Sequence, residues 1–394
     1  MGKIKDINLI MEVEMSFGKG KKCCGCTACQ SICHKKAIVM NEDNEGFLYP
    51  NIDEKLCNNC NLCRKVCPIY KENAKQVKHT QPKVYAVTHK NDNSRKSSQS
   101  GGLFYALAEK ILEDDGVVYG CGYSDNNMVI HMRVESIDEL KKLQGSKYVQ
   151  SEIGDSFLNV YNDLLSNKKV LFSATSCHLA GLYRYLNLKK INMDNLFTCD
   201  LVCHGVPSPL IYKENLKYIE NKYDSKIEKV NLRDKKSHGW HSHVETYKLE
   251  NGKIIESRLF TELFYSNMAL RPYCEVCEFS TIHKPADITM ADYWGIEKAH
   301  EDLIDDNWGI SLALVHTQRG DNLIKESDLN LLDSSIEKCM QPNLKGPSNI
   351  PVQRNRFWND YFNKGYDFIL KKYTPHGGIP FKIRRKVLKY LKKW

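Results

Sequence analysis

Several features that mark common protein classes are missing from this chain of 394 residues. It has no run of about 18 apolar residues, so we expect no membrane-spanning helix. Residues 1–17 mix charged with apolar side chains and lack the apolar core of a signal peptide. Asp6 stands where a myristoylation signal has Ser or Thr. We therefore expect a cytoplasmic protein.

Two phosphate-binding fingerprints are also absent. The chain contains neither a G-x-G-x-x-G turn nor a G-x-x-x-x-G-K-[ST] loop, which disfavours an ordinary nicotinamide-binding Rossmann unit and a P-loop nucleotidase. The basic residues are spread along the chain rather than gathered in one stripe, so we expect no nucleic-acid partner. The net charge of +9 is compatible with an acidic redox partner such as a ferredoxin or a flavodoxin.

The composition is that of a globular protein, with 42% hydrophobic and 27% charged residues. At this length two or three domains are expected. The chain has 16 cysteines. Because the cytoplasm keeps thiols reduced, so many cysteines indicate metal or redox chemistry rather than a disulfide framework.

Eight of the cysteines form two quartets with identical spacing. Each quartet is C-x2-C-x2-C-x3-C, the pattern of two-cluster ferredoxins, in which the fourth cysteine of one quartet binds the other cluster. Structural zinc sites usually have two C-x2-C pairs with a longer spacer, so zinc is the less favoured alternative. We predict one [4Fe–4S] cluster on Cys23, Cys26, Cys29 and Cys67, and a second on Cys57, Cys60, Cys63 and Cys33.

The neighbourhood of the quartets supports a small domain. Cys24 breaks the pattern, and we interpret it as a spare thiol. After the quartets, residues 37–39 and 69–70 each predict a short apolar strand.

The remainder alternates predicted strands and helices, which indicates an α/β body with a mixed sheet. Strands are predicted at 84–88, 116–123, 128–134, 169–174 and 196–202, and helices at 100–113 and 178–188, with a capping box at Ser136. A β-meander is predicted at 227–232, 244–249 and 253–260. The last residues, 382–394, are basic and amphipathic; the tail is expected to dock on its own domain or to contact a membrane surface or an acidic partner.

Three further features suggest a ligand site. Ser100, Gly101 and Gly102 precede a predicted helix, where backbone N–H groups can receive an anion, although plain helix caps also have this composition. Cys177 and Cys203 each end a predicted strand, where α/β sheets bind ligands. The pair Cys274–Cys277 has C-x2-C spacing. These four thiols could hold a third cluster, but on spacing alone buried cysteines or a zinc pair remain alternatives.

These motifs occur in an order that carries a resemblance. The sequence SGG at 100–102, GSKYVQ at 145–150, the Cys177 strand end, DLVCHGVP at 200–207, Cys274–Cys277 and ADITMADYWG at 286–295 together resemble the coenzyme F-420 hydrogenase/dehydrogenase beta-subunit family with an N-terminal ferredoxin module. The likeness covers roughly residues 20–320. Where the family commonly has Gly-Thr-Pro-Cys-Gln, this chain has ATSCH at 174–178.

The resemblance implies an α+β protein: a small two-cluster ferredoxin-like domain, then a non-Rossmann α/β flavin-binding body with a mixed sheet, and a short basic helical tail. It implies FAD and a third [4Fe–4S] cluster with Cys177, Cys203, Cys274 and Cys277 as ligands. The implied flavin contacts are Ser100, Gly101, Gly102, Gln144, Gly145, Ser146, Lys147, Tyr148, Val149 and Gln150. The expected divisions are a lead-in at 1–19, the ferredoxin-like domain at 20–72, a linker at 73–82, the body at 83–165 and 166–335, and an extension at 336–394.

The implied activity is that of an oxidoreductase. Electrons would pass from a ferredoxin-type donor through the clusters to FAD, and a hydride would be exchanged with an organic acceptor, a deazaflavin or another compound. His204, beside Cys203, is the candidate proton donor because imidazole titrates near neutral pH. The alternatives are a flavin-free electron carrier that docks to a catalytic partner, or an iron–sulfur sensor or scaffold. Residues 238–243, which contain three histidines around Trp240, predict a solvated loop, and for Asp287 and Asp292 a structural and a chemical role are equally plausible.

Overall fold

The computed structural model describes residues 23–70, 81–300 and 306–375. The predicted lead-in at 1–19, all but the last two residues of the predicted linker at 73–82, and the predicted basic tail at 382–394 lie outside these residues. Within them, no helix is both long enough and apolar enough to cross a bilayer.

The first described residues form a small module that repeats its own geometry. Helix α2 (Ala28–Ile32) packs on helix α3 (Leu62–Val66), and each is preceded by a left-handed residue at the same place in its quartet, Thr27 with φ 59° and Asn61 with φ 58°. Strand β1 (Ile38–Glu42) follows the first quartet as predicted and pairs antiparallel with β2 (Leu48–Ile52). The strand predicted at 69–70 is wrong, because β1 takes its partner from the segment before the second quartet.

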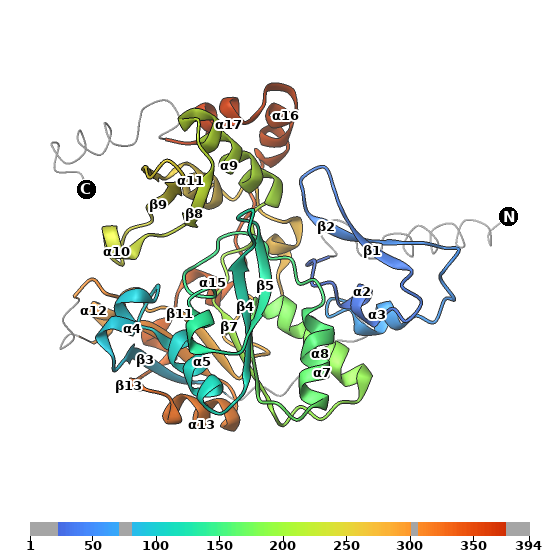
Figure 1. Cartoon of the computed structure of the whole chain (residues 1–394), viewed down its shortest axis with the longest axis vertical. Coiled ribbons are helices and arrows are strands. Elements are labelled where there is room, and N and C mark those ends of the chain that lie inside the picture. Colours follow the sequence, from blue (N-terminus) through green and yellow to red (C-terminus); the bar gives the residue numbers. More distant parts are fainter. Residues whose placement is uncertain (1–22, 71–80, 301–305, 376–394) are drawn as a thin grey trace.

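The body is built on an eight-stranded mixed sheet (Figure 1), which confirms the predicted α/β architecture. Its four central strands β11, β7, β6 and β4 are parallel neighbours, and the outer ones are antiparallel. In the order of the sheet, the strands are β13 (Leu329–Ser334), β3 (Lys83–His89), β12 (Ser311–Val315), β11 (Ile288–Asp292), β7 (Leu196–Leu201), β6 (Val170–Ser173), β4 (Val117–Tyr123) and β5 (Val129–Val134).

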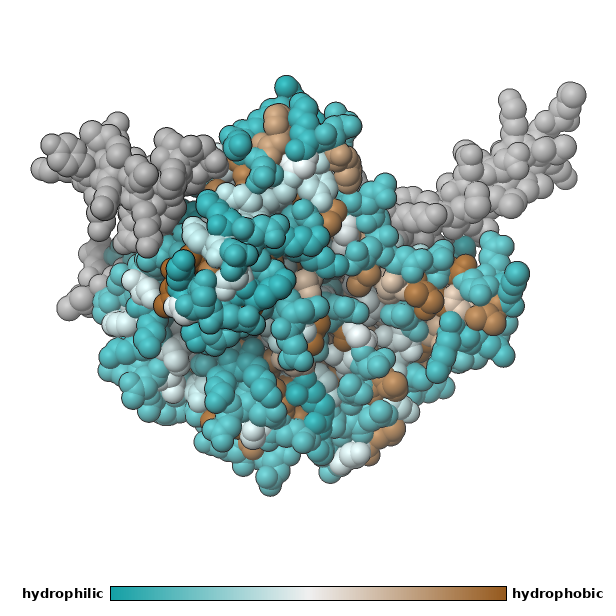
Figure 2. Space-filling model, turned by 45° about the horizontal axis from the view of Figure 1, so that its top comes forward, coloured by the Kyte–Doolittle hydropathy of each residue, from teal (hydrophilic) through white to brown (hydrophobic). Residues whose placement is uncertain are grey.

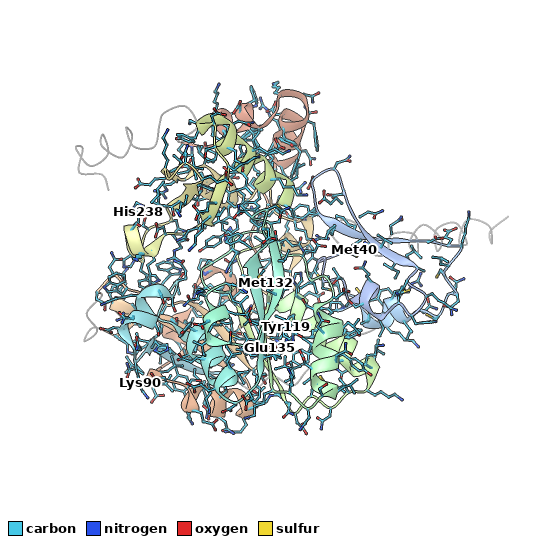
Figure 3. The ribbon with its side chains drawn as sticks, in the orientation of Figure 1. Met40, Lys90, Tyr119, Met132, Glu135 and His238 are labelled. Carbon is cyan, nitrogen blue, oxygen red and sulfur yellow. The ribbon has the colours of Figure 1, made fainter. Side chains whose placement is uncertain are left out.

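Helices cover both faces of the sheet because side chains alternate along each strand. Tyr119 and Phe172 face α7 (Ser156–Leu165) and α8 (Ser176–Lys189), and this core also includes Cys24, Cys26 and Ala28 of the module. Val118 and Leu171 face α5 (Leu103–Glu113) and α13 (Gln318–Glu326) on the other side. Figure 3 shows Tyr119 among the central strands and Met40 out on the module. The module and one face of the sheet thus share a hydrophobic core.

A second layer contains the predicted meander, with one correction. Strands β8 (Ile227–Asn231), β9 (Glu245–Leu249) and β10 (Ile254–Ser257) pair in that order, but residues 258–260 do not continue β10. They open α11 (Leu259–Tyr265), because Phe260, Leu263 and Phe264 are buried at helical spacing. Helices α9 (Pro209–Tyr223), α16 (Arg354–Lys364) and α17 (Tyr366–Tyr373) complete this layer.

Short elements connect these layers. The hairpin predicted around residues 125–127 joins β4 to β5, and the Ser136 hydroxyl caps α6 by accepting the Glu139 N–H at 3.4 Å. The helix predicted from residue 100 begins at Leu103. The short helices are α4 (Asp92–Ser97), α6 (Ile137–Leu140), α10 (Lys235–His238), the 3-10 turn η3 (Pro272–Val276), α12 (Ile296–Ala299), α14 (Ile336–Cys339) and α15 (Pro342–Lys345).

The face shown in Figure 2 is mainly hydrophilic, and its hydrophobic side chains are scattered. Some of them gather on the ferredoxin-like module at the right of the view. In that module Val39 and Leu56 are 54% and 53% exposed. The module therefore presents apolar side chains to its surroundings.

Candidate functional site

The thiols of the first predicted cluster lie together. Burial raises the pKa of Cys67 to about 12, and the neighbouring Cys26 and Cys23 raise it further. The pKa of Cys29 is also raised by burial and then by Cys26, Cys23 and Cys67. The Gly25 N–H points at Cys23 Sγ at 3.4 Å, an N–H···S contact of the kind that stabilises cluster thiolates. The structure thus brings Cys67 to the first quartet, as the crossed ligand pattern requires.

The second set is more exposed. Burial raises the pKa of Cys63, with Cys57 and Cys60 close by, and Cys60 is exposed. Cys33 belongs to the same end of the module, since the ring of the adjacent His34 lies 3.4 Å from Asn58. Cys33 Sγ accepts the Ala37 N–H at 3.3 Å.

The four remaining candidate thiols line one cavity in the body. Cys177 opens α8, Cys203 follows β7, and Cys274 and Cys277 belong to η3 and its end. Because β6 and β7 are parallel neighbours, their carboxyl ends place Cys177 and Cys203 at the same edge of the sheet. The fold thereby brings these thiols from distant parts of the sequence to one site.

A fifth thiol lines the same cavity. Cys24 is 4% exposed and is hydrogen-bonded to Cys177, and this bond is the main reason that the pKa of Cys177 falls to about 7. Cys24 also contacts Cys26. The residue interpreted as a spare thiol therefore lies between the first predicted cluster and the cavity.

The chemistry of this cavity fits an iron–sulfur cluster. Burial raises the pKa of Cys203 to about 12 and that of Cys277 to about 11, so both keep their protons at neutral pH and would release them on binding iron. The Val206 N–H lies 3.5 Å from Cys274 Sγ. Among the described residues no three His, Cys, Asp or Glu side chains converge on one point as a single-ion site needs. A four-iron cluster differs in this respect, since each thiolate binds its own iron.

His204 lies at the edge of this cavity. Its Nε2 is 2.7 Å from Asn267 Oδ1, and its ring packs 5.0 Å from Phe264 and 5.5 Å from Tyr265, between centroids. The candidate proton donor is thus held in place by an amide and two aromatic rings.

The predicted flavin-binding segment 144–150 runs from one half of the site to the other. Gln144 Nε2 lies 3.4 Å from Ser97 Oγ, close to the turn at 100–102. At the other end Gln150 lines the cysteine cavity and donates to the Cys24 carbonyl at 3.0 Å. Between them Lys147 has a pKa lowered to about 8 by burial, and Tyr148 packs 5.2 Å from Phe264. Gly145 is exposed, Ser146 is partly exposed, and Val149 is buried.

The turn at 100–102 has a packing role. A Cβ on Gly101 would lie 2.1 Å from the Val87 carbonyl oxygen, and Gly102, with φ +98°, starts α5 against His89. The Gly101 N–H already donates to Ser311 Oγ at 2.9 Å, and the Ser100 hydroxyl donates to the Ile310 carbonyl. These glycines are therefore needed to pass the start of α5 close to β3 and β12, whatever they bind.

Two buried polar atoms, one beside this turn and one beside Lys147, fit a cofactor. Gln99 Nε2 and the Tyr123 hydroxyl have no hydrogen-bond partner among the described residues. Because an unpaired buried polar group costs about 1–3 kcal/mol, such atoms mark places where a ligand can bond. Gln99 precedes the turn, and Tyr123 lies beneath the Lys147 ammonium, 5.7 Å from ring centroid to Nζ.

An aromatic surface that the sequence did not predict adjoins these residues. Trp240 stacks on Trp294 at 4.8 Å, and His243 lies 5.4 Å from Tyr265. Trp294 and Tyr265 are 38% and 47% exposed, which is unusual for large rings and suits stacking of a planar ligand. The prediction of a solvated loop at 238–243 is wrong for Trp240, which is 1% exposed.

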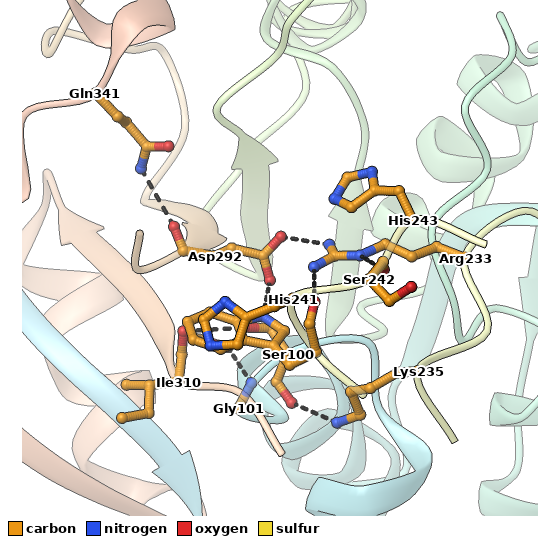
Figure 4. Close-up of polar contacts among 12 residues, drawn as sticks. Ser100, Gly101, Arg233, Lys235, His241, Ser242, His243, Asp292, Ile310 and Gln341 are labelled. Carbon is orange, nitrogen blue, oxygen red and sulfur yellow. Dashed lines mark hydrogen bonds and ion pairs between the residues drawn. The ribbon is translucent and has the colours of Figure 1, made fainter. Parts of the chain in front are cut away.

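Buried charges hold this surface in place. Figure 4 shows Asp292 paired with Arg233 and Lys235 donating to the Ser100 carbonyl, at 2.6 and 3.1 Å. Asp292 also accepts the Trp240 ring N–H at 2.6 Å. Asp287 accepts from the N–H and hydroxyl of Thr198. Both aspartates thus have a structural role, since their carboxylates bond to neighbouring segments of the chain. Their positions at the two ends of β11 were the only sequence feature that pointed to this role.

Comparison with known proteins agrees with this geometry. Residues 22–70 match the 4Fe-4S dicluster domain, which makes the chain an iron–sulfur protein. Residues 167–332 match the family described as the C terminus of the coenzyme F420 hydrogenase/dehydrogenase beta subunit. The resemblance seen in the ordered motifs is therefore confirmed: a match to a 4Fe-4S dicluster domain is followed by a match to the C-terminal part of that beta-subunit family.

One curated relative and one solved structure illustrate the likeness. The F420-dependent formate dehydrogenase subunit beta of Methanocaldococcus jannaschii is 23% identical over 294 residues, which cover 73% of this chain and 71% of the relative. A chain of the F420-reducing [NiFe] hydrogenase complex from Methanosarcina barkeri is 18% identical, with a TM-score of 0.45, and the match covers 73% of this chain and 90% of that one.

Proposed function

We propose that this chain is an iron–sulfur flavoprotein oxidoreductase that relays electrons between a ferredoxin-type donor, three [4Fe–4S] clusters and FAD. The observation that carries the proposal is the cavity lined by Cys177, Cys203, Cys274 and Cys277, which Cys24 joins to the first quartet. When bound, the clusters would carry single electrons, and FAD would store two and exchange a hydride with an organic acceptor.

The chain's own residues would hold and orient these groups. The two quartets and the four cavity cysteines would be the cluster ligands, and N–H groups such as that of Val206 would stabilise the thiolates. The segment 144–150 and the turn at 100–102 would contact the flavin, with Gln99 Nε2 and the Tyr123 hydroxyl as polar groups that can bond to it. The exposed rings of Trp294 and Tyr265 would stack on a planar acceptor.

His204 is the proposed proton donor. Its ring nitrogen Nε2 is held by Asn267 at 2.7 Å, which fixes the ring at the edge of the cysteine cavity. Because Nε2–H donates to Asn267 Oδ1, the proton available for transfer would be the one on Nδ1. The acceptor would be a deazaflavin, as for the named relatives, or another planar organic compound.

The exposed end of the module is the proposed entry for electrons. Cys60 is exposed, and the apolar side chains of Val39 and Leu56 lie on the same module. A redox protein such as a ferredoxin or flavodoxin, or a catalytic partner subunit, would dock there. The relative's name, subunit beta, favours docking to a catalytic partner, which is also part of the second candidate function, an electron-transfer subunit without flavin.

The test of the third cluster is Cys274→Ala. We expect the anaerobically purified variant to lose about four irons and part of its visible absorption, while the ferredoxin-type signals persist. The matched control is Cys339→Ala, because Cys339 is also buried but packs in a separate core with Ile336. Equal iron content in wild type and Cys274→Ala would contradict the assignment of a third cluster to this cavity.

A further inference from the structure

Arg271 is an unusual buried cation. It is 1% exposed and stands between α11 and η3, three residues before Cys274. No aspartate or glutamate pairs with it among the described residues' ion pairs. A charge buried in this way is costly unless its surroundings compensate it, so the groups around the guanidinium must supply that compensation.

All the partners of its guanidinium group belong to the module or face it. Nε donates to the Cys23 carbonyl at 2.8 Å, and Nη2 donates to the Leu48 carbonyl at 2.9 Å and to Cys23 Sγ at 3.6 Å. Nη1 donates to Gln150 Oε1 at 2.8 Å, and the group lies 4.3 Å over the Tyr49 ring. Arg271 thus fixes the loop of the first quartet onto the body.

The loop is shaped to receive this group. Gly25 has φ +73°, and a Cβ there would lie 2.7 Å from Arg271 Nη1 and 2.5 Å from Gln150 Nε2. Only glycine allows both side chains to approach so closely. Gln150 continues the contact by donating to the Cys24 carbonyl at 3.0 Å. Two successive carbonyls of the quartet loop are therefore held from the body side.

The same residue also lines the body cavity. That cavity is bounded by Cys24, Cys177, Cys203, Cys274 and Cys277 as well as by Arg271. Burial raises the pKa of Cys23, and Arg271 is the strongest influence opposing it. The Arg271 guanidinium group uses four of its five N–H groups to bond to the module and to Gln150. One hydrogen on Nη1 is left.

We infer that Arg271 is a positioning residue shared by two cluster sites, the first quartet of the module and the body cavity, and that its charge raises the reduction potential of both clusters. This inference rests on the proposed function, since it needs both clusters. Reduction adds one negative charge to a cluster, and a buried cation nearby favours the reduced state because the low dielectric strengthens the attraction. Arginine stays protonated at every relevant pH, so the effect is constant.

The experiment is a redox titration of purified holoprotein, followed by electron paramagnetic resonance, with Arg271→Gln. We expect both clusters to become harder to reduce, by at least tenfold in the equilibrium constant, about 59 mV for a one-electron couple. The exposed second cluster of the module serves as an internal reference and keeps its potential. Arg271→Lys retains the charge but not the forked contacts, and we expect smaller shifts.

Arg354→Gln is the matched control. Arg354 also joins body to module, through both carboxylate oxygens of Glu45, but no cysteine is among its contacts. The control variant therefore removes an equal charge from the same interface without touching a thiol. If Arg271 only held the module in place, the two variants would give similar shifts.

A second variant, Gln150→Glu, tests the inference in case Arg271→Gln does not assemble its clusters. Gln150→Glu places a carboxylate against the Arg271 guanidinium, 2.8 Å away in the present structure, and should lower both potentials with the arginine still in place. Unchanged potentials in cluster-loaded variants, or a shift in one cluster alone, would overturn the shared role. Absence of the body cluster from wild type would instead contradict the proposed function itself, and with it the shared role.

Discussion

Burial in the folded protein changes the pKa of single side chains near the site more than their sequence neighbours do. His243 is the clearest example: its Nδ1 lies 2.8 Å from the Tyr265 hydroxyl, and burial followed by nearby Arg233 lowers its pKa to about 3. Asp292 partly opposes this effect. The ring is therefore neutral at pH 7 and accepts the phenol hydrogen bond, which helps to fix the aromatic surface.

The depressed pKa of His243 predicts a pH dependence of stability. In the unfolded chain a histidine has a pKa of about 6.5, so the unfolded state gains protons first and the stability contributed above about pH 6.5 is lost as pH falls toward 3. Between pH 7 and pH 5, the free energy of unfolding of His243→Phe should fall by about 1 kcal/mol less than that of the wild type, after allowance for the partial exposure of the ring. The melting temperature of the variant should therefore fall less steeply over this range.

Calorimetry across this pH range measures the slope. His241→Phe is the matched control, because His241 is an exposed neighbour in the same segment. Parallel slopes for wild type and His243→Phe would show that His243 is not held neutral by burial.

Spacing along the chain made some residues of the site predictable and others not. The eight quartet cysteines and the two strand-end cysteines stand in local patterns that indicate their role. Arg271, Trp294 and Cys24 do not, since their partners lie far away: Arg271 meets Cys23 across 248 positions. No local periodicity encodes such a contact, so only the folded structure reveals it.

Among the elements, α8 links the chemistry of the body to that of the module. It begins at the Cys177 end of β6, and its length packs against α2 and α3. Gly181 in this helix is buried, and a Cβ there would lie 2.9 Å from Cys26 Sγ and 3.1 Å from Cys26 Cβ. The absence of a side chain at 181 thus sets how closely the first quartet approaches the body.

Gly181→Ala should separate the module from the body. Alanine favours a helix by about 1 kcal/mol over glycine, but overpacking against a sulfur held by a cluster costs about 1–3 kcal/mol. We expect a lower melting temperature and faster amide exchange in residues 23–32, measured by hydrogen–deuterium exchange. Gly346→Ala is a control for the substitution itself, because a Cβ at Gly346 would meet nothing within 4 Å and its backbone is extended, with φ 174°. Exchange in Gly181→Ala no faster than in Gly346→Ala would contradict this role of α8.

Elements are predictable where burial alternates regularly. The strands β3 to β7 and the hairpin β4–β5 follow from apolar patterns and turn residues. In the sequence, the start of helix α11 looks like the end of a strand, because Leu259 and Phe260 continue an apolar run. The helix is favoured by the burial of Leu263 and Phe264, which only the folded structure reveals. The pairing of β1 with β2 required a contact between the two halves of the module.

At the scale of the whole molecule, the candidate redox sites form a continuous series. The exposed second quartet, the buried first quartet, the body cavity and the aromatic surface follow one another through Cys67, Cys24 and His204. The body cavity and the aromatic surface lie on the eight-stranded sheet, whose strands come from both halves of the chain. The module packs into the same hydrophobic core as α7 and α8. This continuity is what the proposed electron relay needs.

The content of iron, acid-labile sulfide and flavin in protein purified without oxygen tests the relay directly. The relay predicts about twelve irons, about twelve sulfides and one FAD per chain. About eight irons and no flavin would contradict it, leaving a two-cluster module attached to a body that serves only to dock a partner.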